Sequence, residues 1–172
     1  MNDFKEEIVD PADVVLPPNT AVVFNYWNGL RGERFAPAWS EFDWLGLPAQ
    51  LIPWCAVVDV GRDPPSLVYR FFGTRRVALQ RRDYTGHDLD TVRPPSLAAK
   101  VIENNRLVVD SRRPKFFTTL RKPAGPDAEP VEYHFLRLPF SDTGEFVDQV
   151  LSFGMFEEAE IKKVHDLFDA GD

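Results

Sequence analysis

The sequence predicts an α+β fold, in which helices pack on an antiparallel sheet. Three stretches carry apolar residues at helical spacing: residues 21–31, 97–110 and 157–170. Five others have the composition of strands: residues 54–60, 66–73, 114–120, 131–140 and 145–153. Turn sequences, GRDPP and SDTG, favour antiparallel pairing. We therefore expect a five-stranded sheet with short helices and one longer helix on one face, plus N- and C-terminal helices. A helix–sheet cavity is then possible.

Composition excludes several classes of protein. The 172 residues suggest one domain, and 44% hydrophobic residues supply a core. A net charge of −7 argues against a nucleic-acid binder that relies on phosphate neutralisation. One cysteine excludes an intrachain disulfide framework. We find no secretory signal and no apolar run long enough for a membrane span, so we expect a soluble, cytoplasmic protein.

The chain divides into three predicted parts. Residues 1–19 are polar and rich in proline near their end, which indicates a flexible N-terminal arm. Residues 20–155 form the domain, including an amphipathic first helix that Gly32 ends. Residues 156–172 form a C-terminal helix.

The first helix carries a broad apolar stripe. Such a helix packs across the outer face of its own sheet or pairs with its twin in a homodimer. We expect a homodimer whose interface is formed by four residues of this stripe: Val23, Tyr26, Trp27 and Leu30.

No arrangement of residues predicts a metal or catalytic site. The histidines, His87, His134 and His165, and Cys55 have no metal-ligand spacing. Cys55 is interpreted as a small core residue of a strand. The acid pairs Asp88 and Asp90, and Glu41 and Asp43, are interpreted as caps and turn formers. The basic cluster Arg75, Arg76, Arg81 and Arg82 is interpreted as a solvated face, with a site for an anion or an acidic partner as the alternative. We therefore expect no catalytic residue, no metal and no enzyme activity.

Four motifs in order resemble a bacterial subgroup of the PAS domain family. They are NYWNGLRGERFAPAWSEFD, LVYRFFGT, DYTGHDL and LRLPFSDTGEFVDQVLS, within residues 24–153. The resemblance implies the PAS fold, in which the second strand runs directly into a short helix beside a ligand cavity. Gly73 would let the chain turn off the sheet, and Gly86 would let it turn back. Phe140 and Thr143 depart from the subgroup's pattern without affecting the fold.

Six residues are candidate ligand contacts in such a cavity: Tyr69, Arg70, Phe71, Tyr84, His134 and Leu136. Strand alternation places Arg70 opposite Tyr69 and Phe71. It also places His134 and Leu136 on one face and Tyr133 and Phe135 on the other. An Arg or His among apolar walls would orient an anionic or polar ligand. The alternative is that these aromatic residues simply fill the core.

The resemblance implies a stand-alone sensory domain for signal transduction. It would bind a small molecule or a signalling protein and relay the change through its terminal helices. No flavin or haem is expected, because the sequence lacks the flavin-type cysteine motif and a histidine on the long helix. Two alternatives stay open. One is a small α+β enzyme with an acid–base pair in its cavity, for which Arg70 and His134 are the candidates. The other is a dimerisation module that binds no small ligand.

Overall fold

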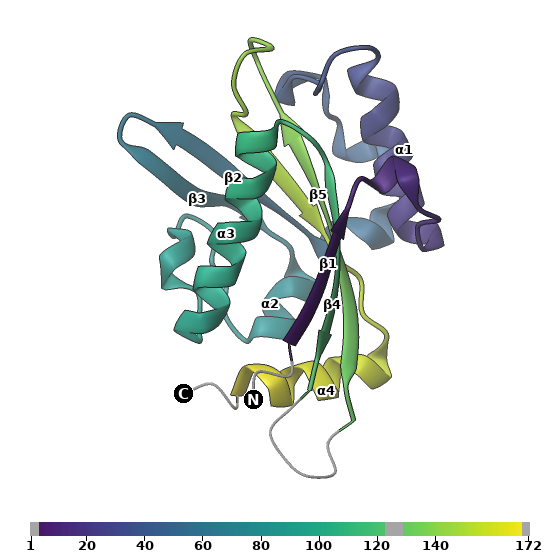
Figure 1. The fold of residues 1–172 in the computed structure, drawn as a ribbon, viewed down its shortest axis with the longest axis vertical. Helices are drawn as coiled ribbons and strands as arrows, with labels where there is room; N and C mark the ends of the chain where they lie inside the picture. Colours follow the sequence, from purple (N-terminus) through teal and green to yellow (C-terminus); the bar gives the residue numbers. More distant parts are fainter. Residues whose placement is uncertain (1–3, 123–128, 170–172) are drawn as a thin grey trace.

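The computed structural model describes residues 4–122 and 129–169 and contains one antiparallel sheet (Figure 1). The strand order is β1-β4-β5-β6-β2-β3. The α+β class and the single sheet are as expected, but the sheet has six strands where five were predicted. Their bounds are β1 Phe4–Val9, β2 Cys55–Arg62, β3 Pro65–Phe72, β4 Lys115–Arg121, β5 Val131–Phe140 and β6 Gln149–Phe153.

The additional strand lies in the predicted flexible arm. Residues 4–9 pair with β4 along its whole length, from Phe4 opposite Arg121 to Val9 opposite Phe116. Charged residues are common on edge strands, where they hinder pairing with other chains. Their number in FKEEIV made this segment look like a solvated arm. One of them, Glu6, is used inside the fold: it forms an ion pair with Lys100 at 2.8 Å and accepts a hydrogen bond from Thr119 at 3.2 Å.

Four α-helices pack around the sheet: α1 Pro18–Arg31, α2 Thr74–Gln80, α3 Pro95–Ser111 and α4 Glu158–Asp169. Short 3-10 helices lie at Pro11–Asp13, Trp39–Glu41, Trp44–Gly46, Ala49–Trp54 and Leu89–Thr91. No helix in the described ranges is long and apolar enough to cross a membrane.

Buried apolar clusters cover both faces of the sheet. On one face, α1 and the linker that follows it cover residues such as Val57, Leu138 and Leu151. On the other face, α2 and α3 lie over Ala56, Val58 and Tyr69 (Figure 1). The prediction that the helices between the second and third predicted strands cover one face is therefore confirmed.

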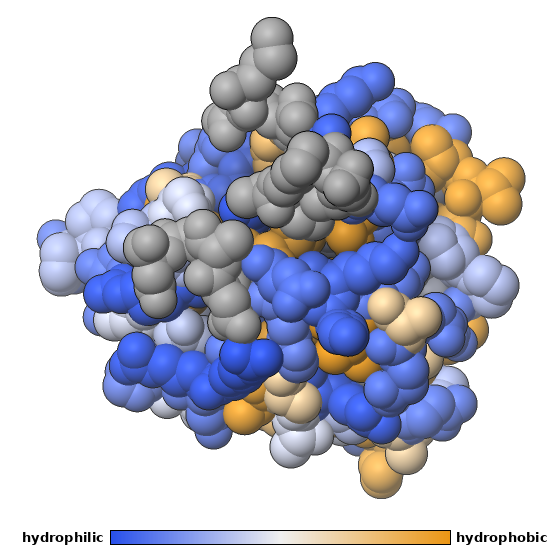
Figure 2. Space-filling model, turned by 90° about the horizontal axis from the view of Figure 1, so that it is seen from below, coloured by the Kyte–Doolittle hydropathy of each residue, from blue (hydrophilic) through white to orange (hydrophobic). Residues whose placement is uncertain are grey.

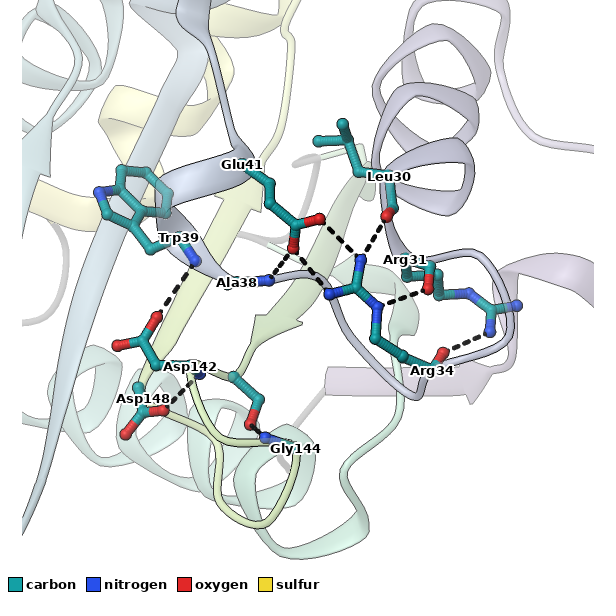
Figure 3. A network of polar contacts seen from close by, with 10 residues as sticks. Leu30, Arg31, Arg34, Ala38, Trp39, Glu41, Asp142, Gly144 and Asp148 are labelled. Atoms are coloured by element: carbon teal, nitrogen blue, oxygen red, sulfur yellow. Dashed lines mark hydrogen bonds and ion pairs between the residues drawn. The ribbon is translucent and has the colours of Figure 1, made fainter.

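The linker after α1 is held by a polar network (Figure 3). Glu41 accepts hydrogen bonds from both Nη atoms of Arg34 at 2.8 Å and from the Ala38 N–H at 2.7 Å. The Trp39 N–H donates to Asp142, whose own N–H donates to Asp148 at 2.8 Å. These bonds fasten the linker to the connection between β5 and β6. They also explain why β6 begins at Gln149 and not at residue 145 as predicted.

Candidate ligand-binding site

The six predicted ligand contacts do not form one site. Tyr69 and Tyr84 lie on the α3 side, with ring centroids 6.2 Å apart. Both contact Phe72, at centroid distances of 5.0 and 5.4 Å. The Tyr84 hydroxyl accepts a hydrogen bond from the Arg93 N–H at 3.1 Å. Both tyrosines are almost fully buried.

Arg70 lies on the opposite face from Tyr69, as predicted, but Phe71 lies there as well, which corrects the predicted alternation. A β-bulge between Val57 and Val58 pairs Val57 with Phe71 and Val58 with Tyr69, so Arg70 is the additional residue. Arg70 is partly exposed, forms an ion pair with Asp59 at 2.8 Å and lies over the Trp39 ring. Phe71 packs on Trp44 at 4.9 Å. A one-residue insertion of this kind reverses the side of every residue that follows it.

His134 and Leu136 also lie on the α1 side. Leu136 is fully buried in the core beneath α1. The His134 ring stacks on Phe116 at 5.4 Å and contacts the Thr118 hydroxyl at 3.2 Å. As predicted, Tyr133 and Phe135 face the other way. His134 and Leu136 are thus separated from Tyr69 and Tyr84 by the sheet itself.

The α3 side contains two buried charges that the sequence analysis did not select as ligand contacts. Arg76, on α2, and Arg137, on β5, expose only 3% and 4% of their surface. The assignment of Arg76 to a solvated basic face was therefore wrong, whereas Arg75, Arg81 and Arg82 are exposed. The signal for Arg137 was its position in the sequence: it interrupts the apolar run FLRLPF on a strand whose second half is buried on both faces.

The two arginines converge on the same part of the sheet. The guanidinium carbon of Arg76 lies 4.7 Å from the Phe135 ring centroid, and that of Arg137 lies 5.3 Å from the same centroid. Ser152 pairs with Arg137 across the β5–β6 ladder, and its hydroxyl lies 3.5 Å from Arg76 Nη1. We call this group the arginine cluster, and its members are Arg76, Arg137, Phe135 and Ser152.

The donors of the arginine cluster are largely unused. Within residues 4–122 and 129–169, Arg76 Nε and Arg137 Nε and Nη1 are buried without a hydrogen-bond partner. Aromatic rings supply part of the compensation, with Phe72 beside Arg76 at 5.4 Å and Phe117 beside Arg137 at 4.6 Å. A guanidinium group presents five donors, so this environment leaves it under-satisfied.

The charges of the cluster affect each other and their neighbours. Burial, and then repulsion from Arg76, lowers the pKa of Arg137 to about 10. Burial also lowers the pKa of Arg76. Burial raises the pKa of Tyr69, and the two arginines act against that rise. Glu6 acts on Arg137 in the opposite direction, but its carboxylate is already held by Lys100, Asn104 and Thr119.

The hollows at the surface differ from the arginine cluster in the charges that line them. One of about 460 Å³ lies between the ends of α1 and α3. Its lining mixes arginines such as Arg31 and Arg112 with the acids Asp10 and Glu33. Both signs of charge are present in this hollow, whereas the arginine cluster is buried and carries positive charge alone.

The α2 helix is positioned by a close backbone contact. A Cβ atom on Gly73 would collide with the carbonyl of Pro53, and the Gly73 N–H donates to the Cys55 carbonyl at 2.9 Å. Glycine is needed here because another stretch of backbone approaches closely. Its φ of −62° is not the reason, because any residue can adopt that value. Gly86, with a φ of 80°, does allow the return turn that was predicted for it.

The predicted dimer interface is mostly buried within the chain. Val23 and Trp27 each expose 1% of their surface, and Trp27 Nε1–H donates to the Pro139 carbonyl at 2.8 Å. The Tyr26 hydroxyl donates to the Asp43 carbonyl at 2.9 Å, and Leu30 is half-buried. The α1 stripe therefore packs on its own sheet, and Val23 and Trp27 are not available to a second copy.

Comparisons with known proteins complete the description. No family model matches the chain, and no curated protein is similar to it. Among solved structures, the chain is similar to one described as the structure of an RNA-binding light-oxygen-voltage receptor, with 12% identity and a TM-score of 0.43. That match covers 96% of this chain and 42% of the receptor chain, so this chain spans less than half of the receptor's length.

Proposed function

We propose that the chain is a PAS-type sensory domain that binds a small molecule between its sheet and α2–α3, and signals through its terminal helices. The position of α2 carries this proposal. One side of this short helix brings Arg76 into the buried arginine cluster. Its other side contacts the C-terminal helix α4. A ligand that moves Arg76 therefore acts on the surface against which α4 packs.

The contacts between α2 and α4 are specific. The Arg75 guanidinium forms an ion pair with Glu158 at 3.3 Å. The His165 ring nitrogen Nε2 lies 3.0 Å from the Ala78 carbonyl. Leu79 of α2 and Val164 of α4 belong to one buried cluster. Seen from the α4 end, the molecule is mostly hydrophilic, with apolar residues in separate places (Figure 2). Val164 and Leu167, on the apolar side of α4, are buried within the domain.

The motif resemblance supports the same function. The LVYRFFGT motif spans the end of β3 and the start of α2, and DYTGHDL forms the segment that leads from α2 toward α3. Phe72 of the first segment lies beside Arg76 at 5.4 Å, and Tyr84 of the second contacts Phe72 at 5.4 Å. We propose a ligand other than flavin or haem, because the chain lacks the motifs of those two cofactors.

The receiver of the signal would be a second cytoplasmic protein or a second copy of the chain. If a homodimer forms, its interface must exclude Val23 and Trp27, which are buried. The enzyme alternative has less support, because arginine stays protonated and does not serve as a general base. Neither of its predicted candidates, Arg70 and His134, lies in the arginine cluster.

Native mass spectrometry of the purified protein, with an absorbance spectrum of the same sample, tests ligand binding. A stoichiometric non-covalent mass would support the proposal. A bare mass, together with no stabilisation by any member of a chemically broad small-molecule library, would contradict it. Hydrogen exchange then tests signalling: ligand should change amide protection in residues 158–169 as well as in α2. A change confined to α2 and α3 would contradict the relay.

A further inference from the structure

We infer that Arg76 and Arg137 bind the oxyanion group, a carboxylate or a phosphate, of a small organic ligand. The inference rests on the proposed function, because it names the class of molecule that the domain senses. It concerns a site that is built from α2, β5 and β6, elements that are far apart in the sequence.

The first argument is the charge balance. Moving a charged group out of water is costly unless a counter-charge and hydrogen bonds compensate for it. Arg76 and Arg137 are both almost fully buried, and none of the described ion pairs includes either one. The nearby carboxylate of Glu6 is bound by Lys100. Two positive charges therefore lack an acid within the described chain.

The second argument is geometry. Both guanidinium carbons lie over Phe135, so they are separated by no more than the sum of their distances from its centroid, about 10 Å. A carboxylate or phosphate accepts paired hydrogen bonds from a guanidinium group. The unpartnered Nε and Nη1 atoms of Arg137 lie on different edges of the guanidinium group, so each is free to donate its own hydrogen bond to a ligand oxygen. The Ser152 hydroxyl beside Arg76 offers a further polar contact.

The third argument is the nature of the surroundings. The cluster is bordered by the aromatic rings of Phe72, Phe117 and Phe135. These rings would contact an apolar part of the ligand, while the arginines hold its charged end. An inorganic anion would use only the arginines. We therefore favour an organic acid or an organic phosphate with an apolar or aromatic body.

The competing explanation is structural. In that case the aromatic rings alone stabilise the arginines, and the arginines hold α2 on the sheet. The two explanations predict opposite effects of Arg→Met substitution on the ligand-free protein. A structural arginine lost to methionine lowers the melting temperature. An uncompensated charge replaced by an apolar side chain of similar length raises it.

The experiment uses the full chain and four probes: benzoate, phenyl phosphate, inorganic phosphate and the neutral isostere benzamide. Calorimetric titration and thermal melting compare the wild type with Arg76→Met, Arg137→Met and Arg137→Lys. Arg106→Met is the matched control, because Arg106 is exposed on α3. We expect wild type to bind benzoate or phenyl phosphate at least about tenfold more tightly than benzamide, and both Met variants to lose that preference. Arg106→Met should keep it.

The outcomes separate the possibilities. A preference for benzoate identifies a carboxylate ligand, and a preference for phenyl phosphate identifies a phosphate ligand. If inorganic phosphate binds as tightly as phenyl phosphate, the inferred organic body of the ligand is contradicted. If benzamide or another neutral compound binds as tightly as the acids, the oxyanion inference is wrong and the sensory function stands. Unchanged acid binding in the Met variants also overturns the inference. If a Met variant does not fold, acid binding is measured on Arg137→Lys, because lysine keeps the charge but loses the paired donors of the guanidinium group. The inference predicts weaker acid binding in this variant, and unchanged acid binding contradicts it. No binding of any probe, with a bare native mass, overturns the inference and the proposed function together.

Discussion

Arg76 and Arg137 lie over the same aromatic ring, that of Phe135, with their guanidinium carbons 4.7 and 5.3 Å from its centroid. Arg76 comes from a helix, and Arg137 comes from a strand 61 positions later in the chain. Like charges at such proximity repel each other, and burial strengthens the repulsion. From this relationship we predict both which ligands the interior binds and how stable the ligand-free protein is.

Removing one of these charges should stabilise the ligand-free protein. Arg137→Met replaces a buried guanidinium with an apolar side chain, and we expect the free energy of unfolding to rise by about 1–4 kcal/mol. Urea unfolding measures it. Arg106→Met, on the exposed side of α3, should stay within about 0.5 kcal/mol of wild type. A loss of stability in Arg137→Met would show that the arginine is part of the structural core.

The junction between β3 and α2 should not tolerate a side chain. In Gly73→Ala, the new methyl group meets the Pro53 carbonyl, so we expect a loss of about 1–3 kcal/mol. The matched control is Gly29→Ala in α1, where a Cβ atom has nothing within 4 Å. That substitution should stabilise the protein by roughly 0.5–1 kcal/mol, since alanine favours helix. Equal effects at the two positions would contradict the close approach described at Gly73.

Substitution of a buried residue of α1 should lower the free energy of unfolding and leave the oligomeric state unchanged. Trp27→Ala removes a fully buried indole and its hydrogen bond to the Pro139 carbonyl, so we expect a loss of about 3–5 kcal/mol. Val22→Ala, at an exposed position of the same helix, should change little. Sedimentation should give the wild-type oligomeric state for the folded fraction of both variants. Dissociation of an assembly by Trp27→Ala, with the free energy of unfolding unchanged, would restore the interface originally predicted there.

Alkaline pH should destabilise the fold through Cys55. Burial raises the pKa of its thiol from 9.0 to about 12. Between these values the unfolded chain loses the proton while the folded chain keeps it, so stability falls as the pH rises. From pH 8 to pH 10, this one group should lower the free energy of unfolding by about 1.4 kcal/mol. Comparing the pH dependence of wild type and Cys55→Ala isolates the contribution, and identical slopes would rule it out.

Local patterns in the sequence predicted most of the sheet and helices. The apolar runs of β2, β3 and β5 and the turn at GRDPP are visible without tertiary information. The strand β1 was missed because its charged residues are accommodated by distant partners, as Glu6 is by Lys100. Such pairing depends on the topology of the sheet, which residue periodicity does not determine.

The site was less predictable than the fold. Tyr69 and Tyr84, predicted as ligand contacts, lie together in one buried cluster on the α3 side, and their contact with a ligand stays a prediction. The bulge at Val57 and Val58 moved Phe71 to the other face, and one-residue bulges leave little trace in composition. Arg76 looked like its exposed neighbour Arg75, since the side of a short helix that faces the core depends on how the helix is docked. The arginine within an apolar strand, at Arg137, was visible in the sequence and could have been chosen as a candidate site residue.

A crystal structure grown with 4-bromobenzoate tests the central claim most directly, because the bromine locates the ligand independently of the protein. We predict an anomalous peak between the sheet and α2–α3, with the carboxylate within about 3 Å of guanidinium nitrogens of Arg76 or Arg137. The same crystals should show α4 displaced or reordered where it contacts α2. A bromine peak only at the surface, or an unoccupied interior at a concentration well above the measured binding constant, would contradict the account.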